Sequence, residues 1–179
     1  MLICIGIFSL FTRHSDVLMS RCIGDAYICT TNLFQDHHGG DVKRAALSAL
    51  HMAKDMIFAA IDVRIPVKRK GNRRPSLESV QVRVGIHVGE VTCGVLGERL
   101  PKFTVLGHDV NVAARMEQTA EPNTIRASEA FRGLLTDTDN DWDSYEVVSM
   151  KNMGSIGTFT MDPCKYGGLR GDYKWSSSL

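Results

Sequence analysis

Asn111 and Arg115 are a pair of residues whose types and spacing could do chemistry. They stand four positions apart, and in a helix that spacing places both side chains on one face. An arginine presents a rigid fork of donors that fits phosphate oxygens, and an asparagine amide can fix a hydroxyl or a ring oxygen. The pair therefore suits a phosphate ester, although by spacing alone we favour an ordinary surface pair on an amphipathic helix.

Two further residues could bind a metal ion or a phosphate. Asp25 follows Gly24 at a turn, and a carboxylate on a tight turn is a natural Mg²⁺ ligand, although most such turns are purely structural. Lys151 stands among glycines and methionines late in the chain, where a flexible ammonium suits a polyphosphate. A lone lysine is usually just solvated, so neither residue identifies a site by itself.

Length and composition exclude several classes of protein. The 179 residues include 21 Lys+Arg and 20 Asp+Glu, and a formal charge of +1 argues against a dedicated nucleic-acid binder. A hydrophobic fraction of 44% and a charged fraction of 23% are typical of a soluble globular domain and exclude a collagen, a coiled coil or a disordered chain. The five cysteines form no CxxC pair, which favours a reducing compartment over a disulfide framework or a zinc cluster.

Hydrophobic periodicity and turn residues predict the elements that must position these side chains. The pattern predicts strands on both sides of the Gly24-Asp25 turn within 23–31, and a hairpin whose strands, 80–88 and 91–95, meet at Gly89-Glu90. The remaining predicted elements are helices over 8–20, 42–61 (capped by Asp41), 109–119 (capped by Asp109) and 128–135 (capped at Ser128), and strands over 103–106, 125–127, 142–150 and 158–161. Helices against a mainly antiparallel sheet make an α+β fold.

Two segments have an unusual composition. Residues 64–76 carry six basic side chains among prolines and a glycine: Arg64, Lys68, Arg69, Lys70, Arg73 and Arg74. We favour a solvated loop over a nucleic-acid or lipid patch, because no aromatic residue is interleaved for base stacking. The apolar run 2–11 is too short to span a bilayer, and we favour a buried element there.

Three stretches together resemble the catalytic domain of class III adenylate/guanylate cyclases. They are CIGDAYIC (22–29), VRVGIHVGEVTCGVLGERLPKFTVLGHDVNVAARME (82–117) and EVVSMKNMGSIGTFTM (146–161), in the order of the family. The resemblance implies a ferredoxin-like (βαββαβ) fold, with a mainly antiparallel sheet flanked by helices. It also implies a signalling enzyme that converts a nucleoside triphosphate into a 3′,5′-cyclic nucleotide and pyrophosphate.

The resemblance also implies a role for each candidate residue. Asp25 matches a metal-binding aspartate, Asn111 the residue that positions the ribose, and Arg115 the residue that stabilises charge on the α-phosphate. Lys151 matches the lysine that holds the terminal phosphates. In the family, two Mg²⁺ (or Mn²⁺) ions serve each site, and the sites form between two catalytic domains. A homodimer or a heterodimer with another cyclase domain, cytoplasmic and with no nucleic-acid partner, is therefore expected.

Two positions that select the base depart from the common patterns of the family. Arg21 stands four residues before Asp25, where adenylate cyclases usually carry Lys and guanylate cyclases Glu. Thr104 stands at the second position and resembles a subset of adenylate cyclases. A cation at the first position can donate to a ring nitrogen of adenine but cannot accept from the amino group of guanine. The two residues therefore favour ATP over GTP as the substrate.

The start of the chain also departs from the family. Ile7 occupies the place of the first metal-binding aspartate, and 7–25 is too short for the two helices that the family has there. We therefore interpret 1–20 as an N-terminal remnant, 21–162 as a cyclase domain truncated at its start, and 163–179 as a tail. The alternative function is a catalytically incomplete or regulatory half that needs a partner chain to bind metal. A sheet without its first strand is expected to have an unpaired row and to be prone to association. The parent protein could be attached to a membrane.

Overall fold

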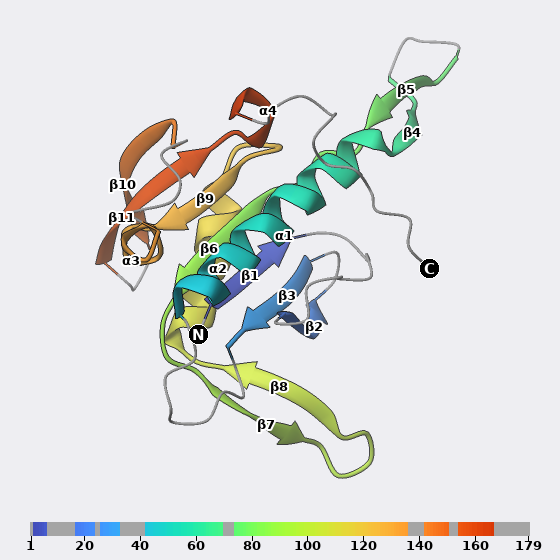
Figure 1. Ribbon diagram of the computed structural model, residues 1–179. Helices are drawn as coiled ribbons and strands as arrows, with labels where there is room; N and C mark the ends of the chain where they lie inside the picture. Colours follow the sequence, from blue (N-terminus) through green and yellow to red (C-terminus); the bar gives the residue numbers. More distant parts are fainter. Residues whose placement is uncertain are drawn as a thin grey trace.

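The computed structural model describes residues 2–6, 17–23, 26–32, 42–69, 74–135, 142–150 and 154–166 (Figure 1). The helices are α1 (Val42–Asp62), α2 (His108–Thr119), α3 (Glu129–Gly133) and α4 (Pro163–Tyr166). The strands are β1 (Leu2–Gly6), β2 (Val17–Ile23), β3 (Ala26–Thr31), β4 (Arg64–Val67), β5 (Ser76–Ser79), β6 (Val84–Val88), β7 (Thr92–Leu96), β8 (Lys102–Leu106), β9 (Ile125–Ser128), β10 (Ser144–Met150) and β11 (Gly154–Met161).

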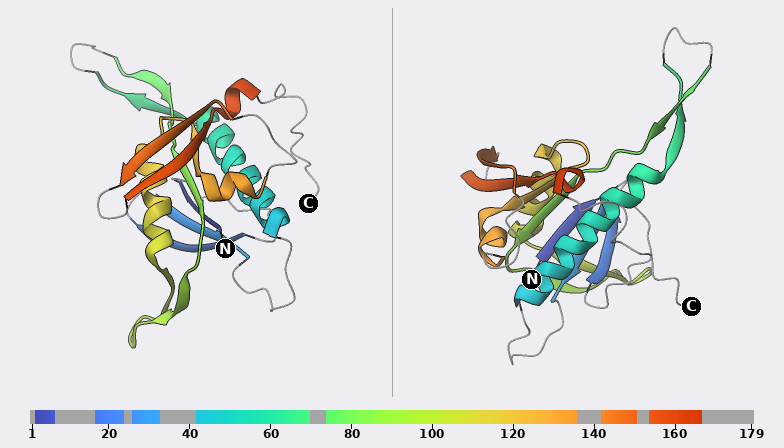
Figure 2. Two further views of the ribbon diagram at one scale, coloured as in Figure 1. Left: turned by 90° about the vertical axis from the view of Figure 1, so that its left-hand side faces the viewer. Right: turned by 45° about the horizontal axis from the view of Figure 1, so that its top comes forward.

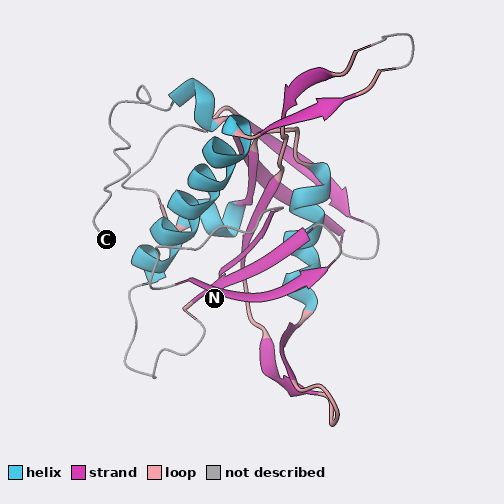
Figure 3. Ribbon diagram, turned by 90° about the vertical axis from the view of Figure 1, so that its right-hand side faces the viewer, coloured by secondary structure: helices cyan, strands magenta, loops and turns pink. Residues whose placement is uncertain are grey.

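A seven-stranded sheet in the order β10-β11-β9-β6-β1-β3-β2 forms the centre of the molecule. Its neighbouring strands are antiparallel except β6 and β9, which run parallel. Helix α1 covers one face of this sheet and α2 the other, as Figures 2 and 3 show from two sides. The predicted α+β class with a mainly antiparallel sheet between helices is confirmed.

The main core lies between α1 and the sheet. The buried face of α1 is rich in alanine, which lets the helix backbone approach the strands closely, with Leu50 and Ile57 filling the gaps. These side chains pack on Val84 and Ile86 of β6 and on strand β9. On the other face, Val112 and Met116 of α2 form a smaller cluster with side chains of β10 and β11. Both helices are therefore held by apolar contacts with the same sheet.

Several local predictions are confirmed. Helix α1 has almost the predicted range, and its predicted cap, Asp41, lies outside the described residues. The Gly24-Asp25 segment joins two antiparallel strands, β2 and β3. Strands β8, β9, β10 and β11 lie where they were predicted, with shifted ends for the last two. Ser128 caps α3, and its side chain accepts a hydrogen bond from the backbone N–H of Phe131.

Predictions about strand partners and the N-terminal region were wrong. Strand β6 does not form a hairpin with β7, because β6 pairs with β1 and β9 while β7 pairs with β8. Residues 17–20 belong to strand β2 rather than to a helix over 8–20. Strand β1 lies between β6 and β3, so the expected unpaired row in the centre of the sheet is filled. The apolar run at the start of the chain thus supplies an interior strand.

Two ribbons of two strands each extend away from the sheet. The first, β4–β5, continues from the end of α1, and its strands include the two ends, 64–67 and Ser76, of the basic segment that was predicted to be a loop. The second, β7–β8, leads into α2. The ribbons project at opposite ends of the molecule in Figures 1 and 3. Among the described residues, no helix is long and apolar enough to cross a membrane.

Candidate active site

Helix α2 lies directly on strand β6 at a glycine. A Cβ atom on Gly85 would come within 2.2 Å of the backbone nitrogen of Glu117 and 2.5 Å of the carbonyl oxygen of Ala113. Only a residue without a side chain allows this close approach. At the same end of the helix, Arg83 forms an ion pair with Glu117 at 2.8 Å. The C-terminal half of α2 is therefore fixed to the sheet by close backbone packing and by a charged pair.

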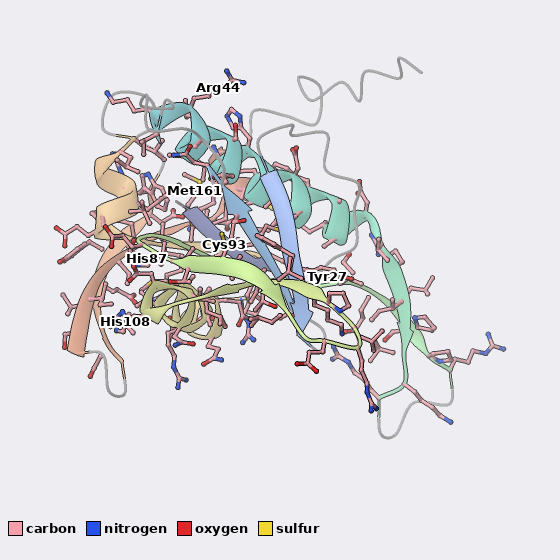
Figure 4. The ribbon with its side chains drawn as sticks, turned by 90° about the horizontal axis from the view of Figure 1, so that it is seen from below. Tyr27, Arg44, His87, Cys93, His108 and Met161 are labelled. Atoms are coloured by element: carbon pink, nitrogen blue, oxygen red, sulfur yellow. The ribbon has the colours of Figure 1, made fainter. Side chains whose placement is uncertain are left out.

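A buried polar cluster fixes the first turn of α2. His87, on β6, lies 2.8 Å from the hydroxyl oxygen of Ser128 through Nδ1 and 3.4 Å from a carboxylate oxygen of Asp109 through Nε2 (Figure 4). The other carboxylate oxygen of Asp109 accepts a hydrogen bond from the backbone N–H of Glu90 at 2.7 Å. The cluster joins β6, the start of α2 and the start of α3.

Asp109 does not cap α2, contrary to the prediction. The helix begins at His108, its N-cap is Gly107, and no side chain bonds to the cap. The Asp109 carboxylate points instead at the backbone after β6 and lies against Gly89, where a Cβ would come within 2.1 Å of it. A capping prediction uses only the local sequence, whereas this contact joins residues that are 19 positions apart. The backbone N–H of Glu90 could have formed a hydrogen bond within a turn between β6 and β7. It bonds to Asp109 instead.

Burial and hydrogen bonding shift the pKa values of both groups in the cluster. Burial lowers the pKa of His87 below its usual value, and the hydrogen bond and charge of Asp109 only partly oppose this. For Asp109, burial raises the pKa, but hydrogen bonds from His108, the Glu90 N–H and His87 outweigh it, so the pKa is lowered. A neutral imidazole beside an ionised carboxylate is therefore the state expected at neutral pH.

Asn111 and Arg115 lie on the exposed side of α2, as their spacing predicted. The helix buries Val112, Ala113 and Met116 on the opposite side. The guanidinium of Arg115 donates a hydrogen bond to the side-chain oxygen of Gln118 at 2.6 Å, one turn further on. Both polar side chains are thus accessible to a ligand or to a second domain, on a helix that is fixed at both of its ends.

The strands of the two base-selecting positions lie next to each other. Arg21 belongs to β2, the edge strand, and its side chain lies outside the described part of the chain. Thr104 belongs to β8, and the β8 strand contacts β2. The Thr104 side chain is 8% exposed, and its hydroxyl donates a weak hydrogen bond to the carbonyl oxygen of Lys102 at 3.3 Å. The base-selecting roles of both residues stay predictions.

Asp25, Lys151 and Ile7 lie outside the described residues, so the structure does not place them. Their flanking strands are placed: β2 and β3 at one edge of the large sheet, β10 and β11 at the other. The described residues contain no group of three or more histidine, cysteine, aspartate or glutamate side chains that could hold a metal ion. We assign no step to a metal ion within the described residues.

His87 and Asp109 are the site residues that sequence reasoning missed or misassigned. His87 is buried, and nothing in the local sequence indicates its bonds to Asp109 and Ser128. The three residues lie 41 positions apart in sequence at the widest. No local spacing joins them, so only the pairing of β6 with β9 and the packing of α2 could have revealed the cluster.

The family follows from a match along most of the chain. The family model described as the adenylate and guanylate cyclase catalytic domain matches residues 4–163. The chain belongs to this cyclase family. The matched range includes Asn111 and Arg115 on α2, as well as the last three residues of strand β1.

Curated relatives of this cyclase domain are much longer proteins. The chain is 30% identical over 158 residues to the receptor-type guanylate cyclase Gyc76C of Drosophila melanogaster, covering 86% of this chain and 9% of the relative. It is 32% identical over 154 residues to the receptor-type guanylate cyclase gcy-7 of Caenorhabditis elegans, covering 86% of this chain and 13% of the relative. The chain thus spans only about a tenth of the length of these relatives.

Solved cyclase structures share the fold of this cyclase domain. The guanylate cyclase domain of RhGC from Catenaria anguillulae, in complex with GTP, has a TM-score of 0.64 at 22% identity, with 89% of this chain and 93% of that chain covered. The guanylyl cyclase Cya2 has a TM-score of 0.66 at 18% identity, with 89% of each chain covered. At these identities the likeness establishes the fold.

Proposed function

We propose that this cyclase domain converts a purine nucleoside triphosphate into a 3′,5′-cyclic nucleotide and pyrophosphate. The observation that carries the proposal is the pair Asn111 and Arg115 on the exposed face of α2, inside a match to the cyclase family that spans 4–163. In the reaction, the ribose 3′-oxygen forms a bond to the α-phosphorus and loses its proton. The bond from that phosphorus to the pyrophosphate oxygen breaks.

Asn111 and Arg115 have separate roles in this proposal. The amide of Asn111 positions the ribose, so that the 3′-hydroxyl faces the α-phosphorus. The guanidinium of Arg115 stabilises the charge that develops on the α-phosphate in the transition state. Lys151 is proposed to hold the terminal phosphates. Divalent ions, Mg²⁺ or Mn²⁺, would neutralise phosphate charge, and Asp25 is the carboxylate proposed to bind them.

A complete site is proposed to need two domains. The strands that flank Asp25 and those that flank Lys151 lie at opposite edges of one sheet. This placement supports a site in which one domain supplies Asp25 and the other supplies Asn111, Arg115 and Lys151. A symmetric homodimer would then form two equivalent sites, and a heterodimer with another cyclase domain could form one or two. The sites would face the cytoplasm, where nucleoside triphosphates are abundant.

The identity of the base is a separate question, and two observations support different answers. The curated relatives are guanylate cyclases, which supports GTP. The cation Arg21 and the hydroxyl of Thr104 favour ATP, because a cation cannot accept the hydrogen bonds that the guanine amino group offers. The comparisons lend no support to the ATP preference. They also do not favour the alternative of a catalytically incomplete half.

The test is an assay of the purified chain with Mn²⁺ and either ATP or GTP, with the cyclic product identified by mass spectrometry. Cyclic nucleotide that disappears in the Arg115→Ala variant supports the function, and the mass of the product identifies the base. A folded chain that makes no product alone but does so with an intact homologous domain would point to the incomplete half. No product in either mixture would contradict the proposed function.

A further inference from the structure

Ribbon β4–β5 is the part of the molecule that the proposed function does not use. It extends from the end of α1 into solvent, on the side away from β7–β8 (Figures 1 and 3). Its base is closed by a hydrogen bond from the Val80 N–H to the Val63 carbonyl at 3.0 Å. About a tenth of the chain therefore forms a projection that adds almost nothing to the hydrophobic core.

The described part of the ribbon carries a dense positive charge. Six basic residues and no acidic residue occur in 64–76. Arg64, Lys68, Arg69 and Arg74 are exposed, and Arg69 pairs with Glu78 at 3.0 Å. Within the described ranges, no ion pair is recorded for Arg64, Lys68 or Arg74. Such a cluster of uncompensated cations on a projection attracts an anionic surface.

Apolar side chains are exposed on the same ribbon. Leu77 is 65% exposed and lies opposite Pro66, so the two side chains share one face with Arg64 two positions away. On the other face, Ile65 is 44% exposed beside Glu78. Cations next to exposed aliphatic side chains suit an interface with anionic headgroups above and acyl chains below. A nucleic acid would be served better by aromatic side chains, of which 64–79 has none.

We propose that ribbon β4–β5 binds an anionic lipid surface. Arg64, Lys68 and Arg74 contact headgroups, and Leu77 enters the boundary between headgroups and acyl chains. Because the ribbon projects from the end of the molecule opposite β7–β8, the domain can bind the membrane with β7–β8 pointing away from it (Figure 2). This inference does not depend on cyclase activity, since it concerns binding alone.

The test is co-sedimentation of the purified chain with vesicles of phosphatidylcholine, with and without phosphatidylserine, and no nucleotide present. Binding is expected only to the vesicles with phosphatidylserine, and it should weaken as salt rises, because salt screens the attraction. Equal binding to both kinds of vesicle, or no binding at low salt, would overturn the proposal. A single-stranded RNA oligonucleotide that binds more tightly than these vesicles would replace it with a nucleic-acid site.

Matched variants distinguish the contribution of the ribbon to vesicle binding from the effect of the overall charge of the chain. Lys68→Gln with Arg74→Gln should weaken binding about thirtyfold, since each cation near an anionic leaflet contributes a factor of about five. The control, Lys43→Gln with Arg44→Gln, removes the same charge from the first turn of α1, about 30 Å away along the helix. The control should bind as the wild type does. Equal losses in the two pairs would show that overall charge, not the ribbon, causes binding.

A second pair of variants tests the apolar contact. Leu77→Thr should weaken binding about tenfold, because it removes aliphatic surface that insertion into the membrane would bury. Threonine still suits a strand. Val147→Thr is the control, since Val147 is also an exposed strand residue but lies on β10. Circular dichroism establishes that each variant folds. A Leu77→Thr variant that binds as tightly as the wild type would contradict the proposed insertion.

Discussion

Ribbons β7–β8 and β4–β5 have the same secondary structure and opposite surfaces. Ribbon β7–β8 exposes the aliphatic side chains of Val95, Leu96, Leu100 and Leu106. Ribbon β4–β5 exposes basic side chains together with Leu77 on one face and Ile65 on the other. Exposed aliphatic side chains gathered on one projection are typical of a protein interface, whereas a dense cationic surface is typical of an anionic partner. The geometry of a projecting ribbon therefore does not determine its role; its side chains do.

The two ribbons also differ in what they are joined to. Strand β8 ends one residue before α2, and Gly107 makes the connection with a φ of 154°. Strand β8 also contacts β2, which leads to the Asp25 turn. Ribbon β4–β5 continues from the end of α1 and leads through residues 80–83 into β6, the strand that α2 packs on. A change in β7–β8 is expected to reach the candidate active site, and a change confined to the exposed side chains of β4–β5 is not.

The largest expected effect belongs to Arg115, on the side of the molecule that carries β7–β8. Arg115→Ala should lower kcat by about 10²- to 10³-fold with a much smaller change in KM, because its charge acts in the transition state. Gln118→Ala, which removes the hydrogen-bond partner of Arg115, is the matched control and should stay near wild-type activity. Lys68→Gln with Arg74→Gln should keep full turnover. Steady-state kinetics check all three, and equal losses in kcat and nucleotide affinity would contradict the role of Arg115.

Local elements of this fold could be predicted from the sequence. The long alanine-rich helix α1 and the paired strands on either side of Gly24-Asp25 are confirmed, because periodicity acts within a few positions. The Ser128 cap is confirmed for the same reason. For the candidate site, the sequence placed Asn111 and Arg115 together on one face of a helix, and the helix is where it was predicted.

Contacts between distant segments could not be predicted. Strand β6 has the alternation of a hairpin strand, yet its partners are β1 and β9, which lie far from it in the chain. Asp109 has the position of a cap, yet it bonds to the Glu90 N–H. Residues 64–76 have the composition of a loop, yet Arg64–Val67 pairs with Ser76–Ser79. In each case a pairing partner outside the local window decides the outcome.

The second-largest effect is expected at Gly85. A substitution there tests how firmly the sheet holds α2, the helix that follows ribbon β7–β8. Gly85→Ala should lower the free energy of unfolding by about 2–3 kcal/mol, because the new Cβ overlaps the backbone of α2. Gly94→Ala on β7 is the control: no atom lies within 4 Å of its new Cβ, so the change should stay within about 0.5 kcal/mol. Urea unfolding followed by circular dichroism measures both. Equal losses would mean that the two glycines do not differ in packing.

Self-association tests the surface difference between the ribbons directly. Leu96→Ser with Leu100→Ser should weaken dimerisation about tenfold or more, since the two changes remove exposed aliphatic surface that a dimer through this ribbon would bury. Leu77→Thr on β4–β5 should leave dimerisation unchanged. Sedimentation velocity over a range of concentrations measures the monomer–dimer equilibrium. If Leu77→Thr weakens the dimer as much as the β7–β8 variant does, the two ribbons share one interface and the distinction between them is wrong.

The smallest expected effect is a pH dependence of the free energy of unfolding. Its cause is His87, on the side of the molecule that carries β7–β8. Burial lowers the pKa of His87 in the folded chain, so the unfolded chain binds more protons between the two pKa values. Stability is therefore lost as pH falls from about 7 through the unfolded pKa of about 6.5 towards the folded one.

Urea unfolding at several pH values measures this loss, which His87→Gln should reduce because glutamine does not titrate. His108→Gln, an exposed neighbour, should keep the wild-type slope. Asp109 does not interfere, because its lowered pKa places its own loss of stability at more acidic pH. If the wild type and His87→Gln lose the same free energy of unfolding as pH falls, the buried imidazole is not the cause of the loss. In that case acid would not destabilise the packing of α2 before it destabilises ribbon β4–β5.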